Sequence, residues 1–159
     1  MPEPSFLYWD ANVFLSYINN DPQRFPVLDA ILEAVETTKT QRIVTSVLSK
    51  VEVAWAANEK LNRALSVAEE KRIDEMWDNP DVIEFVDFGD EIALTARKLM
   101  RTGLTRGWKL RTNDAIHLAS AQWVQAAELQ TYDLKDFAKF GELIGIPISE
   151  PHTIQPKLF

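Results

Sequence analysis

Residues 6–18 read FLYWDANVFLSYI, an apolar run that meets a carboxylate and then continues as an apolar helix pattern. Phe6 to Trp9 has the length and composition of a short buried strand, and Asp10 to Asn20 has apolar residues at helical spacing. A buried strand followed directly by a helix is typical of α/β proteins with a parallel sheet. Asp10 is therefore expected at the carboxyl end of the first strand.

The same alternation of short strand patterns and longer helix patterns continues along the chain. We predict further strands at 42–45, 82–88, 128–132 and 146–148, and further helices at 25–38, 46–58, 61–77, 90–102 and 112–125. Gly103 and Gly107 are predicted to bracket a loop. Because helices separate the strands, we expect parallel pairing through right-handed crossovers. Residues 1–150 are predicted to form one domain, with the helical pair at 46–78 inside it, and 151–159 a C-terminal tail.

The composition narrows the chemistry that the chain can perform. Its 159 residues, 46% hydrophobic and 26% charged, suit one globular domain. The absence of cysteine excludes disulfides and thiolate zinc sites, and only two histidines are present, so any metal is expected to bind oxygen ligands, as magnesium and manganese do. No apolar run reaches the roughly 20 residues of a membrane span, and the N-terminus lacks a signal-peptide pattern. We expect a cytoplasmic protein without a membrane partner.

The charge of the chain is unevenly distributed. A net charge of -7 argues against nucleic acid as a partner, yet residues 97–111, RKLMRTGLTRGWKLR, hold six basic residues and no acid. The rest of the chain carries 11 basic and 24 acidic residues. A basic strip on an acidic body can bind phosphate locally, and it can equally be a solvated helix end and loop.

Four acids are placed where a parallel α/β sheet gathers its functional groups, beyond the carboxyl ends of the strands. Asp10 follows FLYW and Asp133 follows LQTY. Asp114 opens the helix DAIHLASAQW, and Glu52 lies in the helix after the second strand. We expect these four carboxylates to meet at one edge of the sheet.

Each of these acids also has a purely structural interpretation. Asp10 and Asp114 could be helix caps or first-turn acids, and Asp133 could be a turn residue. Glu52 lies on an apolar helix face, so its carboxylate must be coordinated to a metal, protonated, or paired with an Arg or Lys from elsewhere in the fold.

Four converging carboxylates repel one another, and a divalent cation offsets that repulsion. Magnesium binds carboxylate and phosphate oxygens, activates water and stabilises charge that develops on a phosphodiester. The residues that other chemistries require are absent. The chain has no cysteine nucleophile, no G-x-S-x-G nucleophile turn, no G-x-x-x-x-G-K-[ST] phosphate loop and no G-x-G-x-x-G dinucleotide-binding turn.

Four segments resemble, in order, the four motifs of PIN domains: YWDANVFLSYI, IVTSVLSKVEV, RTNDAIHLASA and LQTYDLKDF. The resemblance extends over residues 6–140, and within the superfamily it is to the VapC-type toxins of prokaryotic toxin–antitoxin pairs. It implies a three-layer α/β/α sandwich with a mainly parallel sheet of four to five strands. It also implies an endoribonuclease that depends on Mg²⁺ or Mn²⁺, often dimeric and inhibited by a small antitoxin.

The resemblance also implies roles for individual residues. Asp10, Glu52 and Asp114 would hold one divalent ion, and Asp133 would orient the water that attacks phosphorus in line or help to hold a second ion. The expected products carry 5′-phosphate and 3′-hydroxyl ends. Accessory polar positions fall on Asn12, which could hold the Asp10 loop or cap the helix, and on Ser46, which could be an N-cap.

The remaining polar and aromatic residues leave alternatives open. Arg111, next to the third motif, is the expected RNA-phosphate contact, or else a surface charge. His117 could hydrogen-bond near the metal or be a satisfied, partly buried core residue, and Trp108 could stack on a base or anchor a loop. We predict that the other tryptophans lie in the core or an interface: Trp9, Trp55, Trp77 and Trp123.

Two other functions remain as alternatives to the nuclease. The chain could be a non-catalytic PIN-fold module that binds RNA or protein, although such a module is expected to lack one of the acids. It could also be a metal-dependent phosphatase of small substrates, although the D-x-D motif is absent because Ala11 and Asn12 follow Asp10. Only a nuclease shortens a long RNA.

Overall fold

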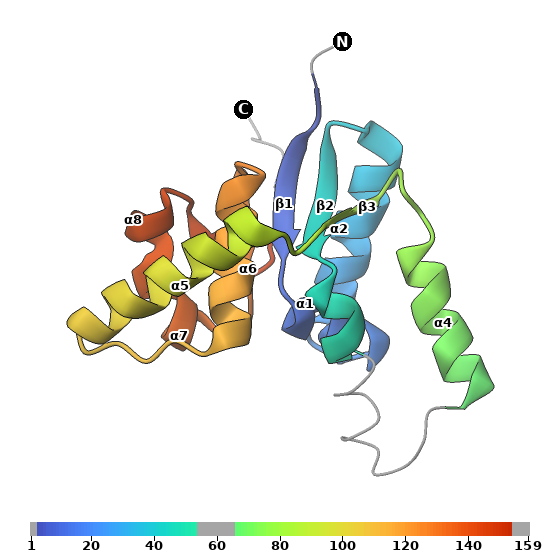
Figure 1. Ribbon diagram of the computed structural model, residues 1–159. Coiled ribbons are helices and arrows are strands. Elements are labelled where there is room, and N and C mark those ends of the chain that lie inside the picture. The colour runs from blue at the N-terminus through green and yellow to red at the C-terminus, as the bar shows by residue number, and fades with distance from the viewer. Residues whose placement is uncertain (1–2, 54–65, 154–159) are drawn as a thin grey trace.

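The computed structural model describes residues 3–53 and 66–153. In this part of the chain five parallel strands form one sheet in the order β3-β2-β1-β4-β5 (Figure 1). The strands are β1 (Ser5–Trp9), β2 (Gln41–Ser46), β3 (Ile83–Val86), β4 (Glu128–Gln130) and β5 (Ile148–Ser149). Because all of them run in the same direction, the carboxyl ends of β1, β2 and β4 lie at one edge of the sheet.

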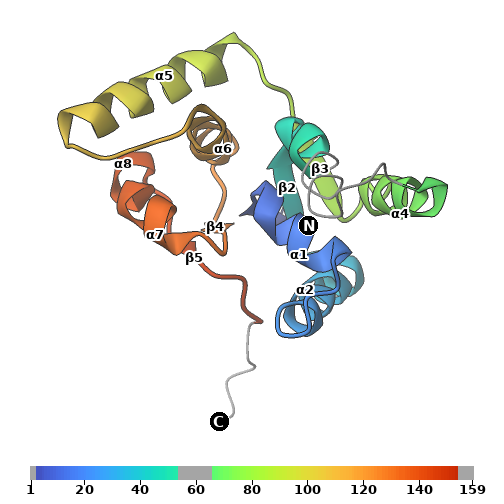
Figure 2. The same cartoon turned by 90° about the horizontal axis from the view of Figure 1, so that it is seen from below.

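Helices cover both faces of the sheet, which makes the protein a three-layer α/β/α sandwich, as predicted (Figure 2). One layer contains α1 (Ala11–Ile18), α2 (Phe25–Thr38) and α4 (Val67–Trp77). The other contains α5 (Asp90–Thr105), α6 (Thr112–Trp123), α7 (Leu134–Phe137), the 3-10 turn η1 (Ala138–Phe140) and α8 (Gly141–Ile144). Residues 48–53 are helical as well and follow β2. No helix in the described part of the chain is long and apolar enough to cross a membrane.

The alternation of side chains along β1 builds the two cores. Tyr8 faces the α5–α6 layer, while Leu7 and Trp9 face the α1–α2 layer, and all three are buried. The ring of Phe14 packs between Trp9 and Trp77, with centroid separations of 5.4 and 4.8 Å. The strand is therefore held rigidly from both sides up to its last residue, directly before Asp10.

The helix predicted at 25–38 has those bounds in the structure. The prediction that Gly103 brackets a loop is wrong. Helix α5 continues through Gly103 to Thr105, and only Gly107, with φ +71°, lies in the turn. The Trp108 carbonyl oxygen and the Phe140 ring lie 3.4 and 3.6 Å from where a Cβ of Gly103 would stand. A Cβ there would make only ordinary van der Waals contacts, so this glycine stands inside the helix without marking its end.

The predicted helical pair at 46–78 is only partly described. Residues 48–53 and 67–77 are helical, whereas 54–65 lie outside the described residues. Helix α4 begins at Val67, where Ser66 and Glu69 form a reciprocal capping box. Among the tryptophans, Trp9 and Trp77 are buried as predicted, Trp123 is 58% exposed, and Trp55 lies outside the described residues.

Candidate active site

A pocket of about 380 Å³ lies at the edge where β1, β2 and β4 end. It is lined by all four acids that the sequence singles out, together with Asn12, Arg111 and His117 (full lining: Asp10, Ala11, Asn12, Leu15, Glu52, Arg111, Asn113, Asp114, His117, Asp133 and Phe137). A larger hollow of about 520 Å³ between α2 and α4 shares none of these residues. The carboxylates come from four separate segments, and the parallel sheet brings them together.

Asp10 is the most deeply buried of the four acids, at 3% exposure. It occupies the N-cap position of α1, but its side chain makes no capping bond. The hydroxyl of Thr131 donates to Oδ2 at 2.7 Å, whereas Oδ1 has no hydrogen-bond partner among the described residues. Burial raises the pKa of Asp10 to about 7, and the hydrogen bond from Thr131 acts in the opposite direction. The helix-cap interpretation therefore does not account for this carboxylate, whose free oxygen is a suitable metal ligand.

Thr131 links the loops that follow β1 and β4. Besides donating to Asp10, its Oγ1 accepts from the Asn12 side-chain amide at 3.2 Å and from the Asp133 backbone N–H at 3.0 Å. The side-chain Oδ1 of Asn12 in turn accepts from the Tyr132 N–H at 3.1 Å. Asn12 therefore connects the two loops and holds Asp10 near Asp133. Thr131 was not among the predicted site residues, although it stands two residues before Asp133 in the fourth motif-like segment, LQTYDLKDF.

Glu52 is paired with a histidine, where the sequence suggested an Arg or Lys. The Nε2 of His117 lies 2.7 Å from Glu52 Oε1, and the Nδ1 of the same ring lies 2.7 Å from the Tyr8 hydroxyl. That hydroxyl also accepts from the Ser46 N–H at 3.1 Å. His117 is 1% exposed, so it is fully buried rather than partly buried. Ser46 stays outside the pocket, where its Oγ accepts from the Leu48 N–H at 3.1 Å.

The other two acids lie at helix starts. Asp114 is in the first turn of α6 and accepts from Arg111 Nε at 3.2 Å. Burial raises the pKa of Asp114, and the Arg111 charge opposes that shift. Asp133 precedes α7 without capping it and lines the pocket. The exposed fraction of the Arg111 side chain is 76%, against 15% for Asp114, so the arginine can leave this pair at little cost.

The donor set fits an oxygen-loving divalent cation. Within residues 3–53 and 66–153, no three acid or histidine side chains stand close enough to ligate a metal together. The reason is local, since Glu52 is turned to His117 and Asp114 to Arg111. The unpartnered Oδ1 of Asp10 and the release of Asp114 by Arg111 would supply oxygen ligands of the kind that Mg²⁺ and Mn²⁺ prefer.

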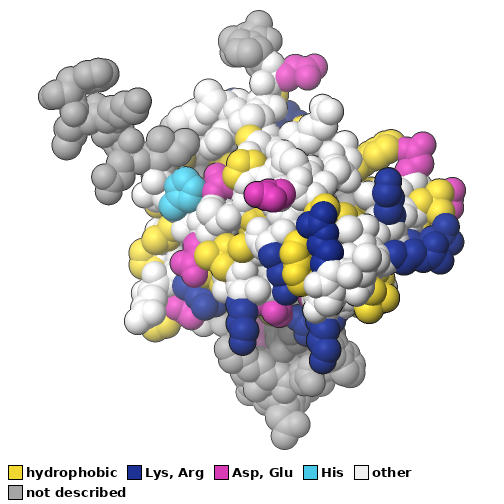
Figure 3. Space-filling view, turned by 90° about the vertical axis from the view of Figure 1, so that its left-hand side faces the viewer, with side chains coloured by type: hydrophobic (Ala, Val, Ile, Leu, Met, Phe, Trp, Pro, Cys, Tyr) yellow, Lys and Arg dark blue, Asp and Glu magenta, His cyan; other side chains and the backbone are white. Residues whose placement is uncertain are grey.

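Basic side chains gather on the face that contains α5, α7 and α8, and Arg111 lines the pocket. All six Lys and Arg residues of 97–111 are exposed, as are Lys135 and Lys139. Figure 3 shows Lys and Arg over the lower and right-hand parts of the face that contains α5, α7 and α8. The charge is thus segregated, so the net charge of the chain does not describe the surface beside the acids.

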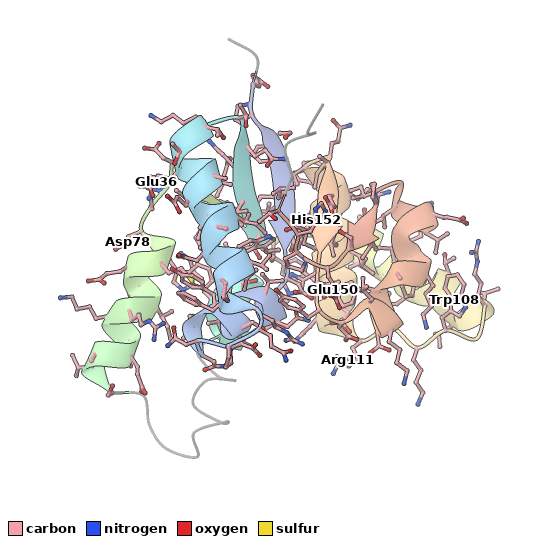
Figure 4. The ribbon with its side chains drawn as sticks, turned by 180° about the vertical axis from the view of Figure 1, so that it is seen from behind. Glu36, Asp78, Trp108, Arg111, Glu150 and His152 are labelled. Atoms are coloured by element: carbon pink, nitrogen blue, oxygen red, sulfur yellow. The ribbon has the colours of Figure 1, made fainter. Side chains whose placement is uncertain are left out.

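Arg111 and Trp108 lie in different places although they belong to one loop (Figure 4). Arg111 lies at the pocket, whereas Trp108 lies well to its side. The Trp108 ring packs edge-on against Phe140 at 5.3 Å, and Arg106 and Lys139 lie 5.0 and 5.9 Å from its centre. These contacts agree with the loop-anchoring interpretation of Trp108.

The fold and the acid-lined pocket together define a nuclease-like α/β/α domain. The chain belongs to the PIN domain family, whose model matches residues 7–143. PIN domains are nucleases and generally depend on a divalent metal. A comparison with curated proteins found no match.

Solved structures of toxin–antitoxin complexes share the fold. A chain of VapBC2 from Rickettsia felis, crystallised with a DNA fragment from the promoter, is 17% identical, with 91% of this chain and 98% of that chain covered and a TM-score of 0.67. A chain of a toxin–antitoxin complex from Klebsiella pneumoniae is 23% identical, with coverages of 93% and 99% and a TM-score of 0.62. A chain of FitAcB from Neisseria gonorrhoeae is 16% identical, with 91% of this chain and 97% of that chain covered and a TM-score of 0.63.

Proposed function

We propose that this protein is a divalent-metal-dependent endoribonuclease and the toxin of a toxin–antitoxin pair. One observation carries the proposal: four carboxylates from separate segments line one pocket, and the most deeply buried of them has an oxygen without a hydrogen-bond partner. A buried carboxylate in that state is costly unless a cation or a proton compensates it. The cost is understandable in a site that binds a cation.

The residues divide the work according to their positions. Asp10, Glu52 and Asp114 would hold Mg²⁺ or Mn²⁺, which when bound activates water and stabilises charge on the phosphodiester. Asp133, held near Asp10 through Thr131, would orient the attacking water or help to hold a second ion. Asn12 keeps the two loops in register, and Ser46 supports the start of the helix that carries Glu52.

A polymeric substrate is supported by Arg111 at the pocket and by the exposed basic side chains of α5 and α7. Arg111 is exposed and close to the acids, and further exposed Lys and Arg residues continue along α5 and α7. Phosphates on either side of the cleaved bond would contact these side chains, which a small phosphate ester does not need. The partner proposal is supported by the neighbours among toxin–antitoxin complexes, and we infer a small antitoxin for this chain as well. The inferred homodimer rests on the resemblance to VapC-type toxins.

The direct test is cleavage of a mixed RNA pool by the antitoxin-free protein, with Mg²⁺ or Mn²⁺ and then with chelator. We expect metal-dependent fragments with 5′-phosphate ends. Asp10→Asn and Asp114→Asn should each slow cleavage by about 10³-fold, since each removes part of several kcal/mol of transition-state stabilisation. The exposed acid Asp78, changed to Asn, is the matched control with normal rate.

Each alternative function has its own outcome in this test. RNA binding without cleavage, across several RNAs and both metals, would favour the non-catalytic binding module. Hydrolysis of small phosphate monoesters with long RNA left intact would favour the phosphatase. Either result would contradict the proposed nuclease.

Arg111→Ala is expected to weaken RNA binding roughly 3- to 10-fold. It should also reduce the slope of log K against log salt by about 0.7, the amount for one phosphate contact to a single strand. The measurement is fluorescence anisotropy of a labelled RNA in chelator, so that no cleavage occurs. Arg42→Ala is the control, because Arg42, with a side chain that is 40% exposed, is also ion-paired, with Glu84, and lies near the opposite end of the strands. Equal salt slopes for the two variants would exclude Arg111 as a phosphate contact.

A further inference from the structure

A chain of buried hydrogen bonds connects the core of the sheet to Glu52. It begins at the Ser46 N–H at the end of β2, passes through the Tyr8 hydroxyl on β1 and the His117 ring on α6, and ends at Glu52 Oε1. Tyr8, Ser46 and His117 are each at most 1% exposed, while the exposed fraction of the Glu52 side chain is 24%. Three buried groups therefore position one carboxylate that reaches the pocket.

The two ends of this chain set the direction of its hydrogen bonds. The Ser46 N–H can only donate, so the Tyr8 oxygen accepts from it and keeps its own hydrogen for another partner. At the other end a carboxylate can only accept, so the ring hydrogen lies on His117 Nε2 and is donated to Glu52 at 2.7 Å. In that neutral tautomer Nδ1 is unprotonated and accepts from the Tyr8 hydroxyl at 2.7 Å.

We propose that His117 is the positioning residue of the metal site, holding Glu52 by Oε1 so that Oε2 remains available to the cation. The inference deepens the proposed function and rests on it. A free glutamate side chain loses rotamer entropy when it is ordered. Because His117 already orders Glu52, that cost falls on folding rather than on metal binding.

A histidine that merely satisfied the core would not produce this arrangement. His117 lines the pocket beside the carboxylate that it holds, and its other nitrogen is fixed by a tyrosine that a backbone N–H orients. If His117 only filled space in the core, a hydrophobic side chain of similar size in its place would leave the metal affinity unchanged. If His117 instead positions Glu52 through a donated hydrogen bond, the metal affinity is expected to fall when that donor is removed.

The test compares Mn²⁺ binding, followed by electron paramagnetic resonance of free Mn²⁺, with the ring tautomer measured by ¹⁵N NMR. We expect wild-type His117 to carry its hydrogen on Nε2. His117→Leu should bind Mn²⁺ about 10- to 100-fold more weakly. His117→Gln, which retains a donor at a similar reach, should stay within a few-fold of wild type. Tyr8→Phe should lose less than His117→Leu and give a mixture of tautomers.

The control is a second histidine–glutamate pair. His152 Nε2 lies 2.9 Å from Glu128 Oε1, away from the pocket, and His152→Leu should leave Mn²⁺ affinity unchanged. Circular dichroism of each variant checks folding, and if His117→Leu does not fold, His117→Asn, whose amide is too short to reach Glu52, takes its place.

The outcomes separate the two proposals. An Nδ1–H tautomer in the wild type, or a folded His117→Leu protein with wild-type Mn²⁺ affinity, would overturn the positioning role and leave the nuclease intact. A wild-type protein that binds no Mn²⁺ would overturn the metal site and the role of His117 together.

Discussion

Asp10→Asn is expected to stabilise the metal-free protein by about 4 kcal/mol at pH 8. Burial raises the pKa of Asp10 from 3.8 to about 7, and a shift of this size corresponds to about 4 kcal/mol. The native protein bears that cost because a buried carboxylate must be ionised at pH 8, with one oxygen unpartnered. Asparagine carries no charge and can still accept from the Thr131 hydroxyl.

The effect depends on pH in a defined direction. Below pH 3.8 Asp10 is protonated in both the folded and the unfolded chain, so its burial does not lower the free energy of unfolding through ionisation. Between 3.8 and about 7 the unfolded chain ionises first, so the free energy of unfolding falls as pH rises, and above about 7 the loss is complete. The advantage of Asp10→Asn should therefore shrink from about 4 kcal/mol at pH 8 to about 2 kcal/mol at pH 5.

Urea unfolding of both proteins in chelator, at pH 5 and pH 8, measures this difference. Asp78→Asn, at an exposed site, is the control with no pH-dependent gain. Added Mg²⁺ should stabilise the wild type and leave Asp10→Asn unchanged, since only the wild type keeps the ligand. An asparagine variant less stable than wild type at pH 8 would contradict the account of Asp10 as a strained, buried anion.

Thr131→Val is expected to destabilise the protein by about 3 kcal/mol at pH 8. Valine has nearly the same shape, but three groups lose the partner that the hydroxyl gave them: the Asp10 carboxylate, the Asn12 amide and the Asp133 N–H. Leaving buried polar groups unsatisfied costs about 1–3 kcal/mol each, more when one is charged. RNA cleavage should fall as well, because Asp10 and Asp133 lose their common anchor.

Thr45→Val provides the matched comparison. Thr45 is also a fully buried threonine near the end of a strand, but its hydroxyl bonds to that of Ser49 at 2.7 Å, so a loss of about 1 kcal/mol is expected. Combining Thr131→Val with Asp10→Asn should give a smaller loss than in the wild-type background, since the charge is gone. Equal losses for the two valine variants would show that Thr131 has no special role.

The architecture of this protein follows from local sequence patterns. Apolar runs of strand length and helix-period segments alternate, and the run FLYW with its following helix already indicates a parallel α/β sheet. Because parallel strands end at one edge, Asp10 and Asp133 could be placed there from their positions after apolar runs. Those features depend on residues close in sequence, which is why the pattern alone was sufficient.

The partners of the site residues required the tertiary structure. Glu52 meets His117 across 65 residues and Asp10 meets Thr131 across 121, and no local pattern encodes which side chain packs opposite another. The same holds for Gly103, which lies inside helix α5 rather than in a loop, and for the pKa of Asp10, which depends on burial. Sequence periodicity determines which face a residue presents, whereas packing between distant segments determines what that face meets and how charged it can be.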